Sequence, residues 1–438
     1  MKKKQACKPA GGASAMVGIV GLGYVGLPLA VAFARSGLPV LGFDLDEKKV
    51  RAVNAGRSYI KHIPAAEVKD LLRHGGRATS EAADLARADA ILICVPTPLT
   101  KHRDPDMSYV ESAAKMLGGV LRKGQLICLE STTYPGTTRE VVLPLLEKGS
   151  GLKAGRDFHL AYSPEREDPG TTGHSANVIP KVVGGLTEKC LRRARALYDR
   201  VVPRTVPVTS LETAEATKLM ENIFRCVNIA LVNELKQVFA RMGLDIWEVV
   251  EAASSKPFGY MPFYPGPGLG GHCIPIDPFY LAWKAREYES ATRFIELAGE
   301  VNVAMPEYVV GRLAEELNNV KKSLRGSRVL LVGLAYKPNV DDMRESPSLR
   351  LWELLERLGA RVEYHDPHIP VVPEEFGRGG ARTKKLSAAA LKSYDAVLIA
   401  TNHADVDYEL LGRCSRLIVD TRNAMHGVKG VRAKVAKA

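Results

Sequence analysis

One cysteine of the chain, Cys273, lies where a thiol could act as a nucleophile. It stands in the run Gly270-Gly271-His272-Cys273-Ile274-Pro275-Ile276-Asp277, after two glycines and shortly before a carboxylate. Glycines allow backbone N–H groups to approach a reacting centre, and a thiolate in such a loop can attack an electrophilic carbon. The alternative is a buried structural thiol, which is our interpretation of Cys94 and Cys128 because both lie within apolar runs. The glycine-rich loop makes Cys273 the best nucleophile candidate among the 7 cysteines.

A lysine and an asparagine form a second group. Lys218 and Asn222 are four residues apart in a segment with helical periodicity, so they share one helix face. Together they could hold an alkoxide or another oxyanion by charge and hydrogen bonding. A solvated surface pair has the same spacing, and spacing alone favours that interpretation.

A third group is the charged run KPNVDDMRESP at residues 337–347. It follows a strand-like segment, and its Lys337 and Arg344 suit phosphate or sugar oxygens. An ordinary charged loop would have the same composition.

A dinucleotide site is indicated near the N-terminus. Gly21-Leu22-Gly23-Tyr24-Val25-Gly26 fits G-x-G-x-x-G, follows a strand and opens a helix, and Asp44 ends the next strand 18 residues after Gly26. The glycines let the backbone approach a pyrophosphate, whose charge faces the helix N-terminus. Asp44 should accept hydrogen bonds from ribose hydroxyls and repel a 2′-phosphate, which favours NAD over NADP. A glycine-rich turn in an unrelated α/β protein is the competing interpretation.

These groups must be positioned by two α/β halves with a helical middle. Continuous apolar runs alternating with helical segments predict parallel sheets covered on both faces. The expected strands are Met16–Val20, Val40–Phe43, Ala90–Val95, Gln125–Leu129, Arg328–Val332, Arg361–Tyr364, Ala396–Ala400 and Leu417–Val419. The expected helices include Leu211–Met242, Leu349–Leu358 and a stretch from about Glu289 to Val320 with a kink at Pro306. Residues 257–278, rich in Gly, Pro and aromatics, predict a long functional loop.

Composition narrows the class of protein. The net charge of +12 suits either an anionic small substrate or a nucleic acid, but no nucleic-acid motif accompanies it. No apolar run approaches the roughly 18 residues of a membrane helix, and residues 1–16 lack the apolar core of a secretory signal. The cysteines are scattered, without a C-x-x-C pair, which disfavours disulfides and zinc and fits a reducing cytoplasm. The final GVKGVRAKVAKA reads as a basic tail, and residues 1–16 as a flexible start.

Taken together, seven segments resemble the UDP-glucose/GDP-mannose dehydrogenase family. They are GLGYVGLP (21–28), CVPTP (94–98), STTYPGT (131–137), SPER (163–166), KLMEN (218–222), GPGLGGHCIPIDP (266–278) and KPNVDDMRESPS (337–348). The resemblance implies an α/β fold of two Rossmann-like doubly wound parallel-sheet domains joined by a long central helix. It also implies a homodimer or higher homo-oligomer. The domains would be 1–209 for NAD binding, 210–320 for the central helical part with the cysteine loop, and 321–438 for UDP-sugar binding.

The same resemblance implies a four-electron oxidation with two NAD, in which Cys273 carries a thiohemiacetal and then a thioester. Lys218 and Asn222 would stabilise oxyanions, Asp277 would assist water or proton transfer, and Glu165 and Thr132 would handle water. The expected cofactor-binding residues are Gly21, Leu22, Gly23, Tyr24, Val25, Gly26, Asp44, Lys49, Thr97, Thr132 and Arg344. The expected substrate-binding residues are Glu165, Arg166, Lys218, Asn222, Tyr264, Gly268, Gly270, His272, Lys337 and Arg422, of which Arg422 could reach the substrate from a partner subunit. No metal is expected.

The sugar is indicated by a few neighbouring residues. GGHCIPIDPFYL, with His272 before the cysteine, and RSYIKHIP (57–64) look like the branch that acts on UDP-N-acetylhexosamines. UDP-GlcNAc is the first expectation, with UDP-ManNAc and UDP-glucose as alternatives. Two other functions stay open from the residues: a single-step NAD oxidoreductase with a structural Cys273, and a nucleotide-sensing binding protein without catalysis.

Overall fold

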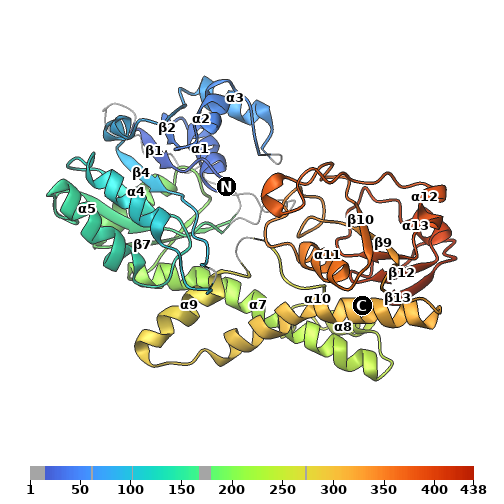
Figure 1. Ribbon diagram of the computed structural model, residues 1–438. Helices are drawn as coiled ribbons and strands as arrows, with labels where there is room; N and C mark the ends of the chain where they lie inside the picture. The colour runs from blue at the N-terminus through green and yellow to red at the C-terminus, as the bar shows by residue number, and fades with distance from the viewer. Residues whose placement is uncertain (1–14, 61–62, 101, 167–178, 272–273) are drawn as a thin grey trace, which may run out of the picture. The chain divides into compact units, whose positions relative to one another are not determined.

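The computed structural model describes residues 15–60, 63–100, 102–166, 179–271 and 274–438 (Figure 1). The chain forms two compact units, of which the first ends at Lys218 and the second spans Leu219–Ala438. Each unit contains an α/β sheet, and the long helix α7 (Leu211–Arg241) leads from the first unit into the second. The predicted fold class, two Rossmann-like α/β domains joined by a long central helix, is confirmed.

The first sheet has eight strands in the order β3-β2-β1-β4-β5-β6-β7-β8. All neighbouring strands are parallel except β6 and β7, which are antiparallel, a pairing that the sequence analysis did not predict. An antiparallel strand at the edge of an otherwise parallel sheet is common. The strands are β1 (Val17–Val20), β2 (Val40–Phe43), β3 (Arg77–Thr79), β4 (Ala90–Ile93), β5 (Leu126–Leu129), β6 (His159–Tyr162), β7 (Lys181–Gly185) and β8 (Thr205–Pro207).

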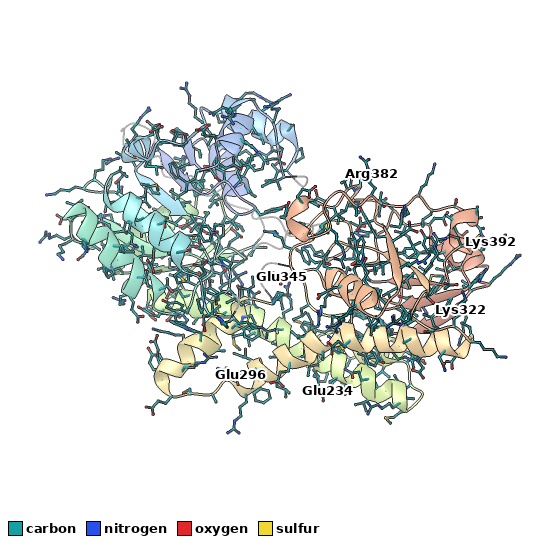
Figure 2. All side chains as sticks on the ribbon, in the orientation of Figure 1. Glu234, Glu296, Lys322, Glu345, Arg382 and Lys392 are labelled. Atoms are coloured by element: carbon teal, nitrogen blue, oxygen red, sulfur yellow. The ribbon has the colours of Figure 1, made fainter. Side chains whose placement is uncertain are left out.

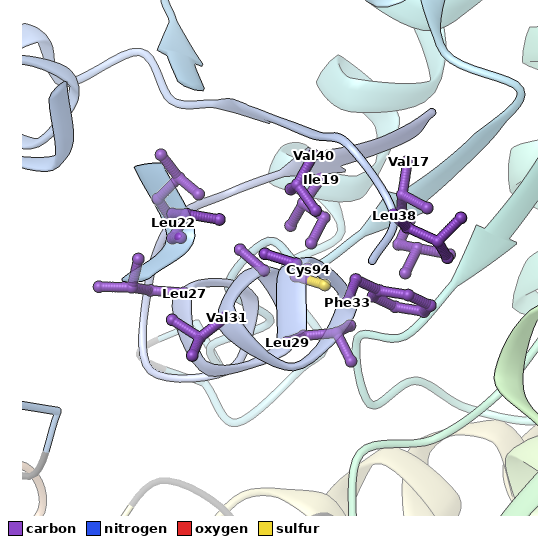
Figure 3. Packing of buried hydrophobic residues seen from close by; sticks show 14 of the residues in the cluster. Val17, Ile19, Leu22, Leu27, Leu29, Val31, Phe33, Leu38, Val40 and Cys94 are labelled. Carbon is purple, nitrogen blue, oxygen red and sulfur yellow. The ribbon is translucent and has the colours of Figure 1, made fainter. Parts of the chain in front are cut away.

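Helices cover both faces of this sheet, and the strands are therefore buried on both sides. Val17 and Ile19 of β1 pack with Leu27 and Phe33 of α1 (Figure 3), whereas Val20 belongs to the core on the opposite face. This alternation explains why the strands read as continuous apolar runs. The helices of the first unit are α1 (Gly26–Arg35), α2 (Glu47–Asn54), α3 (Ala65–Arg73), α4 (Ser108–Gly118), α5 (Leu143–Ser150) and α6 (Glu188–Tyr198).

The second sheet is parallel throughout, with the order β10-β9-β11-β12-β13. Its last strand, β13, corrects the expectation of a basic C-terminal tail, because the segment pairs with β12 instead. Its Lys434 and Lys437 form ion pairs with Glu316 and Asp245, at 2.6 and 2.5 Å. The strands are β9 (Arg328–Val332), β10 (Arg361–His365), β11 (Ala396–Ile399), β12 (Leu417–Asp420) and β13 (Lys434–Lys437).

The helices of the second unit largely match the periodicity of the sequence. The predicted helix near Pro306 continues through that residue, and the predicted irregular loop ends where α9 begins, at Asp277. No helix of the described ranges is both long and apolar enough to cross a membrane. Besides α7, the helices are α8 (Ile246–Ser254), α9 (Asp277–Ala285), α10 (Arg293–Asn319), α11 (Pro347–Arg357), α12 (Ala388–Lys392) and α13 (Tyr408–Cys414).

Candidate active site

The glycine turn after β1 is shaped by close backbone contacts. Gly21 has φ +94°, and a Cβ there would lie 2.5 Å from the carbonyl oxygen of Cys94. A Cβ on Gly26, the first residue of α1, would lie 1.8 Å from the carbonyl oxygen of Gly21. A Cβ on Gly23, in contrast, would meet nothing within 4 Å. Two glycines therefore close the turn, and the third leaves its outer side open, as the approach of a pyrophosphate to the backbone requires.

Asp44 lies at the carboxyl end of β2, next to this turn. Its Oδ2 accepts hydrogen bonds from the Leu22 N–H at 2.9 Å and from Lys49 Nζ at 3.2 Å, and its Oδ1 accepts from the Asp46 N–H. The carboxylate is thus oriented by the turn and remains at the sheet edge, where ribose hydroxyls of a dinucleotide would bind. The residues fit NAD.

Tyr59 is a neighbour of this site that the sequence analysis missed. Its hydroxyl donates to the carbonyl oxygen of Leu22 at 2.6 Å. Burial, followed by the negative charges of Asp44 and Asp46, raises the pKa of Tyr59, so the hydroxyl stays protonated as a donor. Only the tertiary structure reveals this contact, since residue 59 lies 37 positions away from Leu22.

Other predicted site residues of the first unit follow neighbouring strands. Thr97 and Thr132 come shortly after β4 and β5, and Glu165 and Arg166 come after β6. Because the carboxyl ends of parallel strands share one edge, these residues lie on the same edge of the sheet as Asp44. The Glu165 carboxylate lies 3.4 Å from the ammonium of Lys181, a residue that the sequence analysis did not single out.

Lys218 and Asn222 on α7 are both buried, with exposed fractions of 7% and 6%. The interpretation as a solvated surface pair is therefore wrong. The Asn222 side-chain amide donates to the Asp277 carboxylate at 2.5 Å, although the two residues are 55 positions apart. Asp277 is itself buried and opens α9. The structure thus brings two of the predicted catalytic residues, Asn222 and Asp277, into direct contact. Lys218 lies one helical turn before Asn222 on α7.

The glycines before the cysteine serve close packing within the second unit. A Cβ on Gly270 would lie 2.7 Å from the Cβ of Tyr336, and a Cβ on Gly268 would lie 3.2 Å from the Cβ of Pro347. The Gly271 N–H donates to the carbonyl oxygen of Arg344 at 3.1 Å. The loop therefore lies directly against the charged run 337–347. His272 and Cys273 lie outside the described residues.

The predicted substrate cations of the second unit differ in their surroundings. The Arg344 guanidinium is held by both carboxylate oxygens of Asp342, through Nε at 2.9 Å and Nη2 at 2.5 Å. Arg422 Nε donates to the carbonyl oxygen of Ala400 at 2.9 Å, and burial lowers the pKa of Arg422 to about 10. A Cβ on Gly266 would lie 2.5 Å from Arg422 Nη1, so this arginine reaches the glycine-rich loop of its own chain.

Two further predicted substrate-binding residues are Lys337, in the charged run 337–347, and Tyr264, in the loop of residues 257–278. The ammonium of Lys337 lies 5.5 Å from the centre of the Tyr336 ring, and Tyr264 in the loop is half-exposed.

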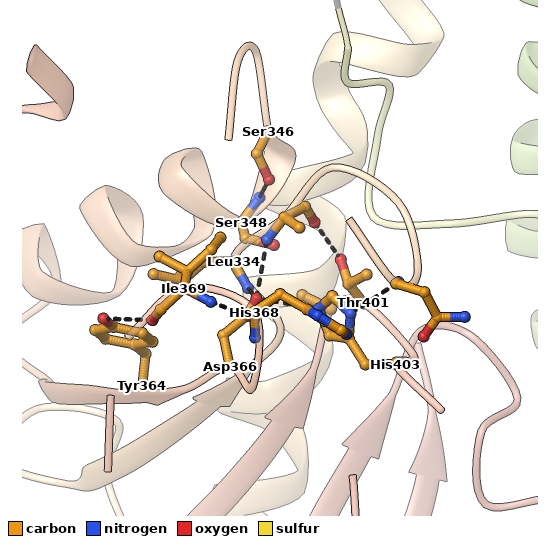
Figure 4. Close-up of polar contacts among 12 residues, drawn as sticks. Leu334, Ser346, Ser348, Tyr364, Asp366, His368, Ile369, Thr401 and His403 are labelled. Atoms are coloured by element: carbon orange, nitrogen blue, oxygen red, sulfur yellow. Dashed lines mark hydrogen bonds and ion pairs between the residues drawn. The ribbon is translucent and has the colours of Figure 1, made fainter. Parts of the chain in front are cut away.

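The carboxyl edge of the second sheet carries a buried carboxylate, Asp366, directly after β10 (Figure 4). It accepts hydrogen bonds from the N–H groups of Leu334, Ala335, His368 and Ile369. The ring of His403 completes the set: its Nε2 lies 3.0 Å from Asp366 Oδ2, and its Nδ1 accepts from the Asn339 N–H. Burial alone would raise the pKa of Asp366, but the contact with His403 and the backbone donors outweigh it and lower that pKa.

Comparison with known proteins identifies the family. The models of the UDP-glucose/GDP-mannose dehydrogenase family match the chain in order: the NAD binding domain at residues 15–202, the central domain at 212–304 and the UDP binding domain at 330–427. The chain belongs to this family. Family membership confirms the predicted enzyme class, an NAD-dependent nucleotide-sugar dehydrogenase, and the predicted cofactor.

Individual relatives agree in length and fold but differ in their sugars. UDP-N-acetyl-D-glucosamine 6-dehydrogenase of Pseudomonas aeruginosa is 35% identical over 93% of this chain and 96% of its own length. NDP-N-acetyl-D-galactosaminuronic acid dehydrogenase of Ralstonia nicotianae is 36% identical over 93% and 95%. The structure of UDP-D-ManNAc dehydrogenase from Pyrococcus horikoshii has a TM-score of 0.86 at 34% identity, covering 96% of this chain and 98% of that one.

Proposed function

We propose that this enzyme oxidises the C6 hydroxymethyl group of a UDP-N-acetylhexosamine to a carboxylate, with UDP-GlcNAc as the first candidate. Bound NAD supplies the hydride acceptor, and the four-electron oxidation uses two NAD molecules in succession. Cys273 captures the C6 aldehyde as a thiohemiacetal and, after the second oxidation, carries a thioester. Water hydrolyses the thioester to the acid and releases the thiol. Covalent capture keeps the reactive aldehyde from escaping.

The other residues act on the charges and protons of these steps. Lys218 and Asn222 stabilise the oxyanions that form at C6, because a buried ammonium and amide are strong donors in a site of low dielectric. Asp277 positions water or accepts a proton, and Glu165 and Thr132 handle the attacking water. Arg166, Tyr264, Gly268, Gly270, His272, Lys337 and Arg422 would contact the substrate, while Lys49, Thr97, Thr132 and Arg344 would contact the cofactor together with Asp44 and the glycine turn.

The observation that carries this proposal is the buried contact between Asn222 and Asp277. A surface loop would leave both side chains in water, yet each is buried, and the carboxylate stands four positions after Cys273. Buried polar groups that pair across such a sequence distance are costly to assemble for stability alone. Their place beside the cysteine loop supports a catalytic role.

The N-acetylated sugar is supported by the composition of the cysteine loop and by the relatives. GGHCIPIDPFYL places a histidine where the glucose and mannose branches usually carry serine, and the relatives reported above act on N-acetylated sugars by name. UDP-ManNAc is the first alternative and UDP-glucose the second.

The experiment that tests this proposal counts NADH released per sugar across UDP-GlcNAc, UDP-ManNAc, UDP-GalNAc, UDP-glucose and GDP-mannose. Two NADH with an N-acetylated UDP-sugar are expected, and one NADH would indicate a single-step oxidoreductase. Turnover of UDP-glucose alone would overturn the N-acetyl preference. The variant Cys273→Ser should stall after the aldehyde, and Cys226→Ser is the matched control, because Cys226 is a buried free thiol of the same unit. Acid formation at the normal rate by Cys273→Ser would overturn the thioester route.

We also propose a homodimer, in which α7 and α10 supply the contact surface. Exposed apolar side chains lie along both helices, and a groove of about 370 Å³ between them is bordered by Glu234 (Figure 2), Val238 and Leu297. A second copy of the chain with the same apolar surface is the natural occupant of an isologous interface. Sedimentation should give twice the chain mass of 47.6 kDa.

A cytoplasmic location and a role in surface polysaccharide synthesis complete the proposal. Among the described residues five cysteines are free thiols, which suits a reducing compartment. We retain the division into residues 1–209, 210–320 and 321–438 as the functional domains.

A further inference from the structure

A buried ion pair in the first unit lies outside the roles proposed so far. Lys181 and Glu130 are almost fully buried, with exposed fractions of 6% and 1%. Lys181 Nζ donates to Glu130 Oε2 at 2.7 Å and lies 3.4 Å from Glu165 Oε2. One ammonium thus bridges two carboxylates, one of which belongs to the proposed catalytic group.

The antiparallel strand explains how Lys181 reaches this place. In the register of β6 and β7, Tyr162 pairs with Gly184, and continuing this register sets Glu165 opposite Lys181. Had β7 been parallel to β6, its first residue would lie at the other edge of the sheet. The one antiparallel pairing of this sheet therefore delivers a lysine to the edge that carries the predicted site residues.

Stability alone is a weak reason for such a pair. Removing two charges from water is costly, and apolar side chains of similar volume often stabilise a core equally well. The charges are therefore better explained by an effect on a neighbouring group.

The neighbours of Lys181 leave its charge divided between the two carboxylates. The Tyr198 hydroxyl donates to Glu130, and its ring centre lies 5.3 Å from Lys181 Nζ. Burial raises the pKa of the nearby Cys94 and Cys128 thiols, so they stay neutral. The backbone N–H of Arg166 also donates to Glu165 Oε1 at 2.6 Å, while the Arg166 guanidinium donates to the carbonyl oxygen of Pro180.

We propose that Lys181 is a positioning residue that holds Glu165 ionised and in place, and that Glu130 is the counter-charge that limits this effect. The proposal rests on the proposed function, in which Glu165 handles water. Glu165, Arg166 and Lys181 also line a cavity of about 20 Å³, which is enough for about one water molecule. The Lys181 ammonium fixes the Glu165 carboxylate beside this space. Glu130 weakens the hold of Lys181 on Glu165, so that Glu165 can still accept a proton.

The arrangement predicts shifts of opposite sign in two variants. Lys181→Met removes the cation beside Glu165 and should raise the pKa of Glu165 by about one unit, because the charged form loses its partner. Glu130→Gln leaves the ammonium facing Glu165 alone and should lower the pKa of Glu165. If the ion pair were purely structural, the two variants would not shift the pKa of Glu165 in opposite directions. Lys181→Arg should keep the wild-type pKa of Glu165.

The measurement is a carboxyl-carbon NMR titration of the full chain labelled at glutamate, with Glu165→Gln to assign the signal. It needs no turnover, so it tests this inference even if the proposed function fails, and failure of that function shows separately as absence of NADH release. With an active enzyme, the acidic limb of the kcat/KM profile should move with the NMR value. Shifts of the same sign, or none, would overturn the inference. If Lys181→Met does not fold, the downward shift in Glu130→Gln decides alone.

Discussion

Both sheets have a corner that consists of a glycine turn after one strand and an aspartate after the next strand along the chain. Only the corner of the first sheet suits a dinucleotide. In both, a glycine with left-handed φ ends the first strand: Gly21 at +94° and Gly333 at +87°. In both, an aspartate after the second strand accepts the N–H of the leucine that follows the glycine. The distances are 2.9 Å for Asp44 and 2.7 Å for Asp366.

The corners differ in what surrounds the aspartate. Gly23 and the start of α1 follow the first turn, whereas Ala335 follows the second, and α11 begins only at Pro347. Asp44 is buried but keeps 9% of its surface exposed, while Asp366 is fully buried and bonded to His403. A carboxylate recognises a ligand only if some of its lone pairs face the ligand. The first corner thus leaves room for the proposed cofactor, whereas the second uses the same residue type to hold its own loops.

The largest contrast is expected from the two aspartates themselves. Asp366→Ala leaves four backbone N–H groups and a histidine N–H without their acceptor. Each buried donor that loses its hydrogen-bond acceptor costs about 1–3 kcal/mol of stability. The second unit should therefore lose most of its stability, whereas Asp44→Ala leaves one buried backbone N–H, that of Leu22, without its acceptor and should cost only about 1–3 kcal/mol. Urea unfolding of both variants checks this. Similar stability losses in the two would contradict the contrast.

Buried carboxylates of the two units should also respond oppositely to pH. Burial raises the pKa of Glu215 to about 7, even though Gly136 and Thr138 donate to it. A carboxyl group whose pKa is higher in the folded than in the unfolded protein contributes its full stabilisation below the unfolded-state pKa, and this is lost as the pH rises through the folded-state pKa. The free energy of unfolding should therefore fall by about 3 kcal/mol from pH 4.5 to above 7. Asp366, with a lowered pKa, should lose its contribution only in more acid solution.

The control for this pH effect is Glu215→Gln, whose unfolding free energy should lack this fall of about 3 kcal/mol over the same range. Urea titrations at several pH values measure both proteins. An unchanged slope in Glu215→Gln would rule out Glu215 as the source.

The variant Gly23→Ala makes the glycine turn of the first corner more like the second corner, which has Ala335 at the matching position. Gly23→Ala should leave the melting temperature unchanged, since its Cβ meets nothing within 4 Å, yet weaken NAD binding by about 100-fold because the methyl group occupies the path of the pyrophosphate. Fluorescence titration with NAD and calorimetry separate the two effects. The reverse variant, Ala335→Gly, should gain no NAD binding, because Asp366 stays bonded to His403. Wild-type affinity in Gly23→Ala would place the cofactor elsewhere.

The smallest effect in this series concerns the choice of cofactor. Asp44→Ala removes a charge-assisted hydrogen bond of about 1.5–3 kcal/mol and should weaken NAD binding by about 10-fold or more. It should also bring the affinities for NAD and NADP closer, because the repulsion of a 2′-phosphate disappears. Glu47→Ala, at an exposed acidic position on α2 nearby, is the control and should change neither affinity. Unchanged selectivity in Asp44→Ala would argue against Asp44 as the ribose acceptor.

Much of the first corner was predictable because its signals are local. The glycine spacing, the apolar strand before it and Asp44 after the next strand all depend on backbone conformations within a short stretch, and the structure has them at the predicted positions. The helical spacing of Lys218 and Asn222 was equally visible, but their burial was not. Whether a helix face meets solvent or another segment depends on packing that periodicity alone does not define.

What the sequence by itself determined is therefore the succession of strands, helices and turns, the cofactor turn and the family to which these motifs belong. The tertiary structure alone decided which distant side chains meet: Asn222 with Asp277, Lys181 with Glu165, and Asp366 with His403. It also decided that the basic C-terminal segment is a strand. The physical reason is that strand order and direction set these contacts, and each follows from burying the whole apolar surface of a unit rather than from any single segment.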